Sequence, residues 1–272
     1  MNRYIASLAF TTSLLSLGLF GCASAASDET EPATHEISQG LKRPRPAVLL
    51  VHGAWAGALG WQSVTGLLLE HGYQVTAVEN PLTSLADDIA TTRRAIERTS
   101  GPVIVVGHSF GGAAITGAAV GNDNVKALVY INAFAPDLGE TIGELAIKYG
   151  PAPLGDALVP DAAGFLFIDP NKFRDVFCGD VWPVEARIMA ASQKPVSAGA
   201  FAEPGGTPAW RTVPSYYLVG THDRAILPEV QRFMAARMGA HVAEIAASHA
   251  SFVSHPNAVV RMIEGAADDV SR

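Results

Sequence analysis

The strongest constraint on the fold of this chain is an apolar run at residues 103–106 that leads directly into Gly-His-Ser-Phe-Gly at 107–111. Small residues compatible with a helix follow, up to residue 120. The two glycines lack a Cβ, so the backbone can bend sharply and the helix can pack close to the strand. A G-x-S-x-G motif between a strand and a helix predicts a strained turn that exposes the serine beside a helix N-terminus. Ser109 is therefore the candidate nucleophile.

Two further polar residues follow later apolar runs. Asp223 comes after the run at 215–219, and His249 comes after the run at 242–245. The ends of parallel strands meet at one edge of a sheet, so we expect both residues near Ser109. A serine hydroxyl needs a base, and that base needs an acid to hold its tautomer. We expect His249 to be the base and Asp223 the acid.

Other polar residues near these motifs compete for the same roles. Asp137 is the rival acid, because it follows the apolar run at 127–131. His255 is the rival base, but it directly precedes Pro256 at an expected helix start, which favours a capping or surface role. We expect His108 to support the turn around Ser109.

The first apolar run, residues 47–51, ends in His-Gly-Ala-Trp at 52–55. A glycine at position 53 lets the backbone turn so that an N–H can point at the reacting oxygen. We expect Ala54 to provide this donor and the N–H of Phe110 to provide the second; loss of one such donor typically costs ~10²–10³ in rate. Trp55 and Phe134 are the candidate walls of the substrate pocket, and His52 is expected to be structural.

The apolar runs are continuous rather than alternating, which is typical of strands covered on both faces in a parallel sheet. Six are predicted, at residues 47–51, 74–78, 103–106, 127–131, 215–219 and, more weakly, 242–245. Helical patterns lie between or after them, at residues 61–71, 85–99, 110–120, 229–238 and 258–267. Ser84 and Asp87 have the spacing of a capping box at the start of the second helix. The alternation predicts an α/β fold with a doubly wound, mostly parallel sheet of about six strands.

Residues 133–211 interrupt this alternation. The segment is too long for an ordinary connection, and it is rich in proline, glycine and aromatic side chains. So many exposed aromatic residues would be unusual on a loop, so we expect an insertion that packs over the carboxyl edge of the sheet as a cap.

Composition limits the class of partner. The 272 residues are 49% hydrophobic and carry a net charge of −7, which argues against nucleic acid or anionic lipid as a ligand. The chain has two cysteines, Cys22 and Cys178. Cys178 has no second cysteine or local histidine, so we expect a half-buried structural thiol and no metal site.

The N-terminus has the pattern of an export signal. A short positive start is followed by an apolar stretch at residues 5–20, which is short for a membrane span. Leu-Phe-Gly-Cys at 19–22 resembles the lipobox of bacterial lipoproteins, with Cys22 as the lipidated residue, whereas Ala-Ser-Ala at 23–25 resembles an ordinary signal-peptidase site. An uncleaved anchor is the third alternative. We expect residues 1–25 to be a signal peptide, 26–45 a flexible linker and 46–272 one domain. The protein would then be exported from a bacterial cytoplasm, either as a periplasmic or outer-membrane-anchored lipoprotein or as a secreted protein.

Four motifs together resemble the α/β-hydrolase superfamily: His-Gly-Ala-Trp, Gly-His-Ser-Phe-Gly-Gly, Gly-Thr-His-Asp-Arg and Ser-His-Ala-Ser-Phe-Val-Ser-His-Pro. The order Ser109, Asp223, His249 is the chain order of that superfamily. They are most similar to its small single-domain branch, which includes plant methyl esterases, hydroxynitrile lyases and bacterial carboxylesterases. The resemblance implies a serine hydrolase that cleaves a small carboxylic ester through an acyl-enzyme without a cofactor.

Other activities of the superfamily stay open. Hydroxynitrile lyases of this branch carry a lysine directly after the catalytic histidine, where this chain has Ala250. Cofactor-free perhydrolases and haloperoxidases share the catalytic residues, and some members bind a small molecule without cleaving it. The sequence does not distinguish oligomeric states.

Overall fold

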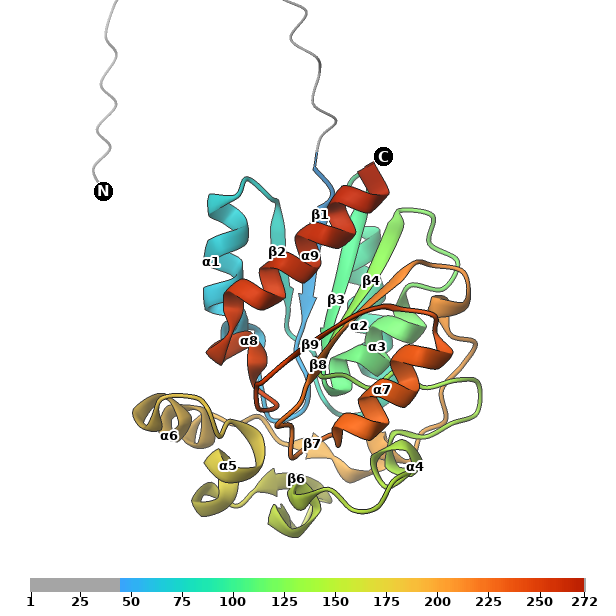
Figure 1. The fold of residues 1–272 in the computed structure, drawn as a ribbon. Helices are drawn as coiled ribbons and strands as arrows, with labels where there is room; N and C mark the ends of the chain where they lie inside the picture. Colours follow the sequence, from blue (N-terminus) through green and yellow to red (C-terminus); the bar gives the residue numbers. More distant parts are fainter. Residues whose placement is uncertain (1–44, 272) are drawn as a thin grey trace, which may run out of the picture. The chain divides into compact units, whose positions relative to one another are not determined.

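The computed structural model describes residues 45–271, and a six-stranded parallel sheet forms its centre (Figure 1). The strand order is β2-β1-β3-β4-β8-β9. The strands are β1 (Ala47–Val51), β2 (Val75–Val78), β3 (Val103–His108), β4 (Val125–Ile131), β8 (Ser215–Gly220) and β9 (His241–Ile245). All residues of β1, β3 and β8 are buried, as expected for continuous apolar runs covered on both faces. The predicted doubly wound parallel sheet is confirmed.

Helices cover the sheet and form its two outer layers. They are α1 (Gln62–Glu70), α2 (Leu85–Glu97), α3 (Phe110–Ala118), α7 (Pro228–Arg237), the short α8 (Ser251–Ser254) and α9 (Pro256–Ser271). α1 packs against α9, and α2 packs against α3. Ser84 caps α2 by accepting from the N–H of Asp87 at 2.9 Å. The predicted capping box is only half formed, because the Asp87 carboxylate accepts from Thr83 instead.

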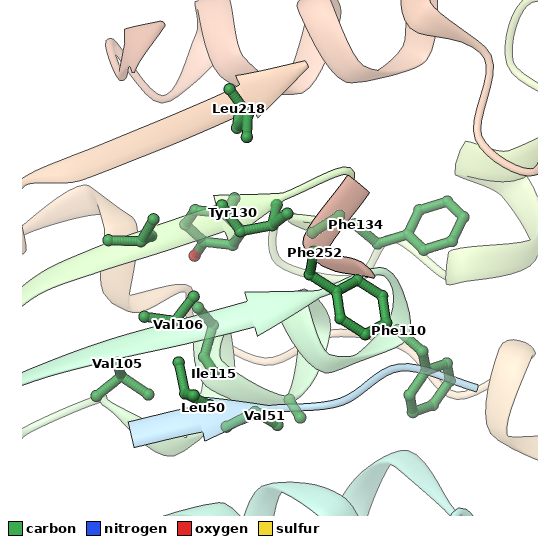
Figure 2. Close-up of a cluster of buried hydrophobic side chains, with 14 of the residues drawn as sticks. Leu50, Val51, Val105, Val106, Phe110, Ile115, Tyr130, Phe134, Leu218 and Phe252 are labelled. Carbon is green, nitrogen blue, oxygen red and sulfur yellow. The ribbon is translucent and has the colours of Figure 1, made fainter. Parts of the chain in front are cut away.

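Apolar side chains on neighbouring strands form a buried core, among them Leu50 on β1, Val106 on β3, Tyr130 on β4 and Leu218 on β8 (Figure 2). Leu50 and Val106 are partners in the register of β1 and β3. Phe110 and Phe134 extend this core beyond the strand ends, at the edge where the polar residues of interest lie. The strand ends are therefore held in a close-packed setting, which limits the movement of the turns that leave them.

The segment between β4 and β8 folds over the carboxyl edge of the sheet as a cap (Figure 1). Its helices are α4 (Ile142–Ala146), α5 (Pro170–Phe177) and α6 (Pro183–Ala191), with short 3₁₀ turns η2 (Pro153–Ala157), η3 (Ala198–Phe201) and η4 (Ala209–Arg211). Strands β5 (Leu158–Pro160), β6 (Phe165–Ile168) and β7 (Val196–Ser197) form a small antiparallel sheet. A further 3₁₀ turn, η1 (Ala58–Trp61), follows β1 in the main domain.

Aromatic packing holds the cap together. Phe173 and Phe177 are fully buried, whereas Trp182 is 74% exposed and is an exception to the expected pattern. Cys178 was expected to be half-buried, and this is wrong: its side chain is completely buried beside α5. Burial raises the pKa of its thiol to about 12, so it is neutral and unreactive at neutral pH.

The predicted signal peptide, the predicted linker and Cys22 lie outside the described residues. Within residues 45–271, no helix combines the length and the apolar character needed to cross a bilayer.

Candidate active site

Ser109 lies on the sharp turn between β3 and α3 with φ 53° and ψ −123°. Such a conformation is unfavourable for a residue with a Cβ, and it costs roughly 1–3 kcal/mol. Two backbone hydrogen bonds hold the turn: the N–H of Ser109 donates to Ile131 at 3.3 Å, and the N–H of Phe134 donates to the Ser109 carbonyl at 3.0 Å. The strained turn predicted from the G-x-S-x-G motif is present.

Close backbone contacts around this turn explain two of the glycines. A Cβ at Gly53 would lie 2.6 Å from the Cβ of Ser109, so the loop after β1 presses directly on the serine. A Cβ at Gly111 would lie 2.6 Å from the carbonyl oxygens of Val51 and His52, so α3 begins against the end of β1. Any side chain at either position would separate the two loops.

His249 and Asp223 form a buried pair. The distance between His249 Nδ1 and Asp223 Oδ2 is 2.8 Å, and neither side chain is exposed to solvent. The carboxylate only accepts hydrogen bonds, so Nδ1 carries a proton, and in the neutral form of the ring Nε2 is the nitrogen with the lone pair. Within residues 45–271, Nε2 is buried without a hydrogen-bond partner, so it does not bond to the Ser109 hydroxyl in this structure and is available to take a proton from a reacting group.

The Asp223 carboxylate is oriented by its own set of donors. Oδ1 accepts from the backbone N–H groups of Ala225 at 2.8 Å and Ile226 at 2.9 Å. Oδ2 accepts from the side-chain amides of Asn132 at 3.1 Å and Gln231 at 2.8 Å. These bonds fix the carboxylate plane and therefore the direction in which it holds the imidazole.

Sequence analysis missed Asn132 and Gln231. Asn132 directly follows the buried strand β4 and has φ 45°, a conformation that asparagine tolerates better than most residues. Gln231 is a polar residue on the buried face of α7, beside Val230, Met234 and Ala235. A polar residue in an apolar stripe was the available signal, but the sequence does not reveal which group it contacts.

Two other histidines, His52 and His108, are fully buried and support the loops around the site. His52 donates from Nδ1 to the Gly53 carbonyl at 2.9 Å and accepts at Nε2 from the N–H of Asn80 at 3.0 Å. His108 Nε2 lies 3.0 Å from the His249 carbonyl, so it supports the loop of His249 and not only its own turn. Burial lowers the pKa of His52 and holds the pKa of His108 well below its usual range, so both rings are neutral at neutral pH.

The rival residues lie in other environments. Asp137 pairs with Arg211 at 2.5 Å on the partly exposed rim of the cap. His255 Nδ1 contacts the Ser254 hydroxyl at 2.9 Å just before α9 begins. Neither contacts the buried pair of His249 and Asp223 through a hydrogen bond in the described residues.

The expected oxyanion donors are the N–H groups of Ala54, next to the Gly53 backbone that approaches Ser109, and of Phe110, which directly follows Ser109. Neither N–H donates to an acceptor within the described part of the chain. Phe110 is the first residue of α3, where the helix leaves N–H groups unpaired and stabilises negative charge. Two unpaired N–H groups beside a nucleophile are what an oxyanion hole requires.

A cavity of about 290 Å³ opens next to Ser109. The four residues predicted for the pocket and its oxyanion side all line it: Ala54, Trp55, Phe110 and Phe134. The cap supplies much of the remaining wall, including Ile147, Leu154, Leu158, Leu166 and Phe201. Among the described residues, none that lines this cavity carries a charged side chain. The cavity therefore suits an uncharged, apolar molecule.

Trp55 fixes part of this wall to the cap. It has φ 59°, an outlier for a bulky residue, and its indole N–H donates to the Leu166 carbonyl of β6 at 2.9 Å. Its ring stacks on Phe201 with ring centres 6.0 Å apart.

Across residues 45–271, no group of three or more histidine, cysteine or acidic side chains is close enough to hold a metal ion.

Comparison with known proteins assigns this fold and site to a protein family. Residues 48–262 match the model of the alpha/beta hydrolase family, and the chain belongs to that family. It is 28% identical to the alpha/beta hydrolase nvfD of Aspergillus novofumigatus over 250 residues, which cover 83% of this chain and 98% of that protein. It is also 28% identical to a pyrethroid hydrolase of Sphingobium wenxiniae over 250 residues, covering 81% of this chain and 87% of that protein.

Among solved structures, the chain is similar to a pyrethroid hydrolase from Sphingobium faniae, with a TM-score of 0.72 and 25% identity. The match covers 82% of this chain and 97% of that one. The predicted family and fold are thereby confirmed, and the names of these relatives agree with the prediction of a hydrolase.

Proposed function

We propose that the protein is a serine esterase that cleaves small to medium, uncharged carboxylic esters through an acyl-enzyme. The observation that carries the proposal is the buried pair of His249 and Asp223, which leaves Nε2 unpartnered, together with the strained turn at Ser109. The esterase and hydrolase names of the relatives support the same reaction class.

In the proposed mechanism, the ester carbonyl oxygen lies toward the N–H groups of Ala54 and Phe110. The Ser109 oxygen attacks the carbonyl carbon while His249 Nε2 takes the serine proton. The negative charge that develops on the oxygen is stabilised by the two N–H groups, and Asp223 stabilises the imidazolium.

The tetrahedral intermediate then collapses. The bond between the carbonyl carbon and the alcohol oxygen breaks, and His249 gives its proton to the leaving alcohol. Water then attacks the acyl carbon while His249 takes its proton, the bond between the acyl carbon and the Ser109 oxygen breaks, and His249 returns the proton to Ser109 as the acid leaves.

The cavity supports a preference for apolar acyl or aryl groups. A volume of about 290 Å³ without charged walls favours neutral groups of modest size and disfavours a second carboxylate. We expect butyryl and aryl esters to have a higher kcat/KM than long-chain esters, and a strong preference for long acyl chains would contradict this assignment.

Hydrolysis of a p-nitrophenyl ester series by the purified protein tests the reaction class. We expect turnover by the wild type and a fall in kcat of several orders of magnitude in Ser109→Ala. Equal rates for both proteins would leave a non-catalytic binding protein as the better assignment, and tight binding of an intact ester would then be expected.

We also propose that the protein is exported, on the basis of the N-terminal pattern alone. The mass of the mature protein isolated from its host distinguishes lipidated Cys22 from cleavage after Ala25. A mature chain that begins at Met1 would contradict cleavage at either site and would leave an uncleaved anchor as the alternative.

A further inference from the structure

The cap holds the loop of His249 on both sides of the histidine. On the preceding side, the Asp180 carboxylate accepts from the Ser248 N–H at 3.1 Å and also from the Ser248 hydroxyl. On the following side, the N–H of Ala250 donates to the Phe177 carbonyl at 3.0 Å. Phe177 is the last residue of α5 and Asp180 lies between α5 and α6, so both acceptors are far from His249 in sequence. Residues 177–180 of the cap therefore bond to the backbone on both sides of the candidate base.

The position of the imidazole depends on these hydrogen bonds between the cap and the residues on either side of His249. Its one side-chain hydrogen bond within the described residues runs from Nδ1 to Asp223, and this bond alone does not fix the direction of Nε2. Two further interactions limit the movement of His249. His108 donates a hydrogen bond to the backbone carbonyl of His249, and the Phe177 ring packs against the imidazole with ring centres 4.9 Å apart. The direction of Nε2 therefore follows the position of the peptide groups around residue 249.

Asp180 is equipped to act as a fixed acceptor. Burial disfavours its charge, but hydrogen bonds from Ser248 and Ser254 outweigh burial and hold the pKa of the carboxyl below its usual value. The Ser254 hydroxyl donates at 3.0 Å, and His255 Nδ1 lies 3.5 Å away. One carboxylate thus collects donors from both the base loop and α8, and it remains an acceptor at neutral pH.

We propose that Asp180 is a positioning residue for the base: through Ser248, this cap carboxylate sets the backbone that aims His249 Nε2 at Ser109. The inference rests on the proposed function of Ser109 and His249. It follows that the cap is not only a wall of the cavity, because removal of its α5–α6 segment from the domain would also displace the base.

The test is Asp180→Asn assayed on a p-nitrophenyl ester. Asparagine keeps the volume, but one of its two acceptor oxygens becomes an NH₂ group, which cannot accept from Ser248. We expect kcat to fall about tenfold to hundredfold, which is the cost of moving a reacting group by roughly 1 Å. KM should stay within about twofold, because Asp180 does not line the cavity beside Ser109.

Asp175→Asn is the matched control. Asp175 is also a cap carboxylate, and it pairs with Arg224 at 3.2 Å, but the pair is exposed and does not bond to the His249 loop. The same substitution there should leave kcat within about twofold of the wild type. An equal loss of kcat in both variants would overturn the proposal, as would wild-type kcat in Asp180→Asn.

Two readouts separate positioning from general loss of structure. The proton on His249 Nδ1 should give a downfield NMR signal in the wild type and in Asp175→Asn, and this signal should broaden or vanish in Asp180→Asn. Ser248→Ala removes only the hydroxyl bond, so its kcat should fall by a smaller factor, and Asp180→Asn with Ser248→Ala should be no slower than Asp180→Asn alone.

If Asp180→Asn does not fold, Ser248→Ala decides the matter, and wild-type kcat in that variant would overturn the proposal. The outcome is distinguishable from failure of the proposed function. An active Ser109→Ala variant refutes the serine mechanism, whereas an inactive Ser109→Ala with a fully active Asp180→Asn refutes only the role of Asp180.

Discussion

The strand ends and the cap contribute different things to one site. The strand ends carry the groups proposed to react: Ser109 after β3, Asp223 after β8 and His249 after β9. The cap contributes apolar wall, and it bonds to residues that flank the site, such as Trp55 and Ser248. The rigid sheet thus places the chemistry, while the insertion shapes the cavity and holds the flanking loops.

The cap is tied to both sides of the site. On the base side the tie is Asp180, and on the oxyanion side Lys194 pairs with Glu79 at 2.7 Å and also donates to the Asn80 carbonyl. The N–H of Asn80 in turn donates to His52, whose ring bonds to Gly53. Changes at the strand ends should therefore abolish turnover, and changes in the cap should alter selectivity, alignment or stability.

The largest effect is expected for Asp223→Asn at the strand ends. An asparagine cannot hold the imidazole in the tautomer that leaves Nε2 free, so kcat should fall about 10⁴-fold with little change in KM. Steady-state kinetics on a p-nitrophenyl ester measure this. Asp137→Asn is the control and should retain near wild-type kcat; a larger loss there would make Asp137 the acid.

Gly53→Ala should have the next largest effect. The new Cβ would lie 2.6 Å from the Cβ of Ser109, so the oxyanion loop or the serine must shift, and kcat should fall about 10²-fold. Gly57→Ala, whose Cβ would lie 3.4 Å from Glu79, is the matched substitution and should be nearly neutral. Similar losses in both variants would remove the argument for close approach at Gly53.

A cap substitution should change selectivity more than chemistry. Phe201→Ala enlarges the cavity next to Trp55 and Phe110, so the ratio of kcat/KM for octanoyl to butyryl esters should rise about tenfold. The reaction with acetyl esters should change less, because small acyl groups use less of the wall. An unchanged ratio would indicate that the acyl group binds elsewhere.

The smallest effect on turnover is expected in the loop that receives cap strand β7, where the prediction concerns stability. Asp88 is buried; its Oδ1 accepts from the N–H of Leu82 at 2.9 Å, and the Leu82 carbonyl accepts from Ser197 of the cap at 2.9 Å. Burial raises the pKa of Asp88 to about 7. Between pH 4 and 7 the unfolded chain releases this proton and the folded protein keeps it, so stability is lost as pH rises.

Asp88→Asn keeps an acceptor for Leu82 and removes the ionisation. The wild type should lose up to about 1.4 kcal/mol of unfolding free energy per pH unit relative to this variant across that window. Urea unfolding at pH 5 and pH 8 measures the difference. Parallel stability curves for the two proteins would show that Asp88 does not titrate there.

The sequence predicted the strand ends well because their constraints are local. Ser109 lies in a motif whose two glycines are required because a Cβ at either position would clash with neighbouring backbone. Asp223 and His249 follow strands that the sequence marks by continuous apolar runs. β9 was the weaker prediction because it is an edge strand with mostly exposed residues, so it lacks the apolar signal.

The internal structure of the cap and the contacts of the supporting polar residues could not be predicted in this way. Residues 133–211 combine short turns and a three-stranded sheet whose pairs are set by tertiary contact, and no periodicity marks them. Asp180 and Gln231 are single polar residues whose partners are distant in sequence, so their type does not reveal their contacts. Cys178 was expected to be half-buried because the packing of α5 over it is equally non-local.

Intact-protein mass spectrometry after reaction with a fluorophosphonate tests the central claim most directly. The account predicts one adduct, on Ser109, with a parallel loss of esterase activity. It also predicts no adduct in Ser109→Ala and much slower labelling in Asp223→Asn, because the same base activates the serine for both reactions. Esterase activity that persists in the fully labelled protein, or an adduct on a residue other than Ser109, would contradict it.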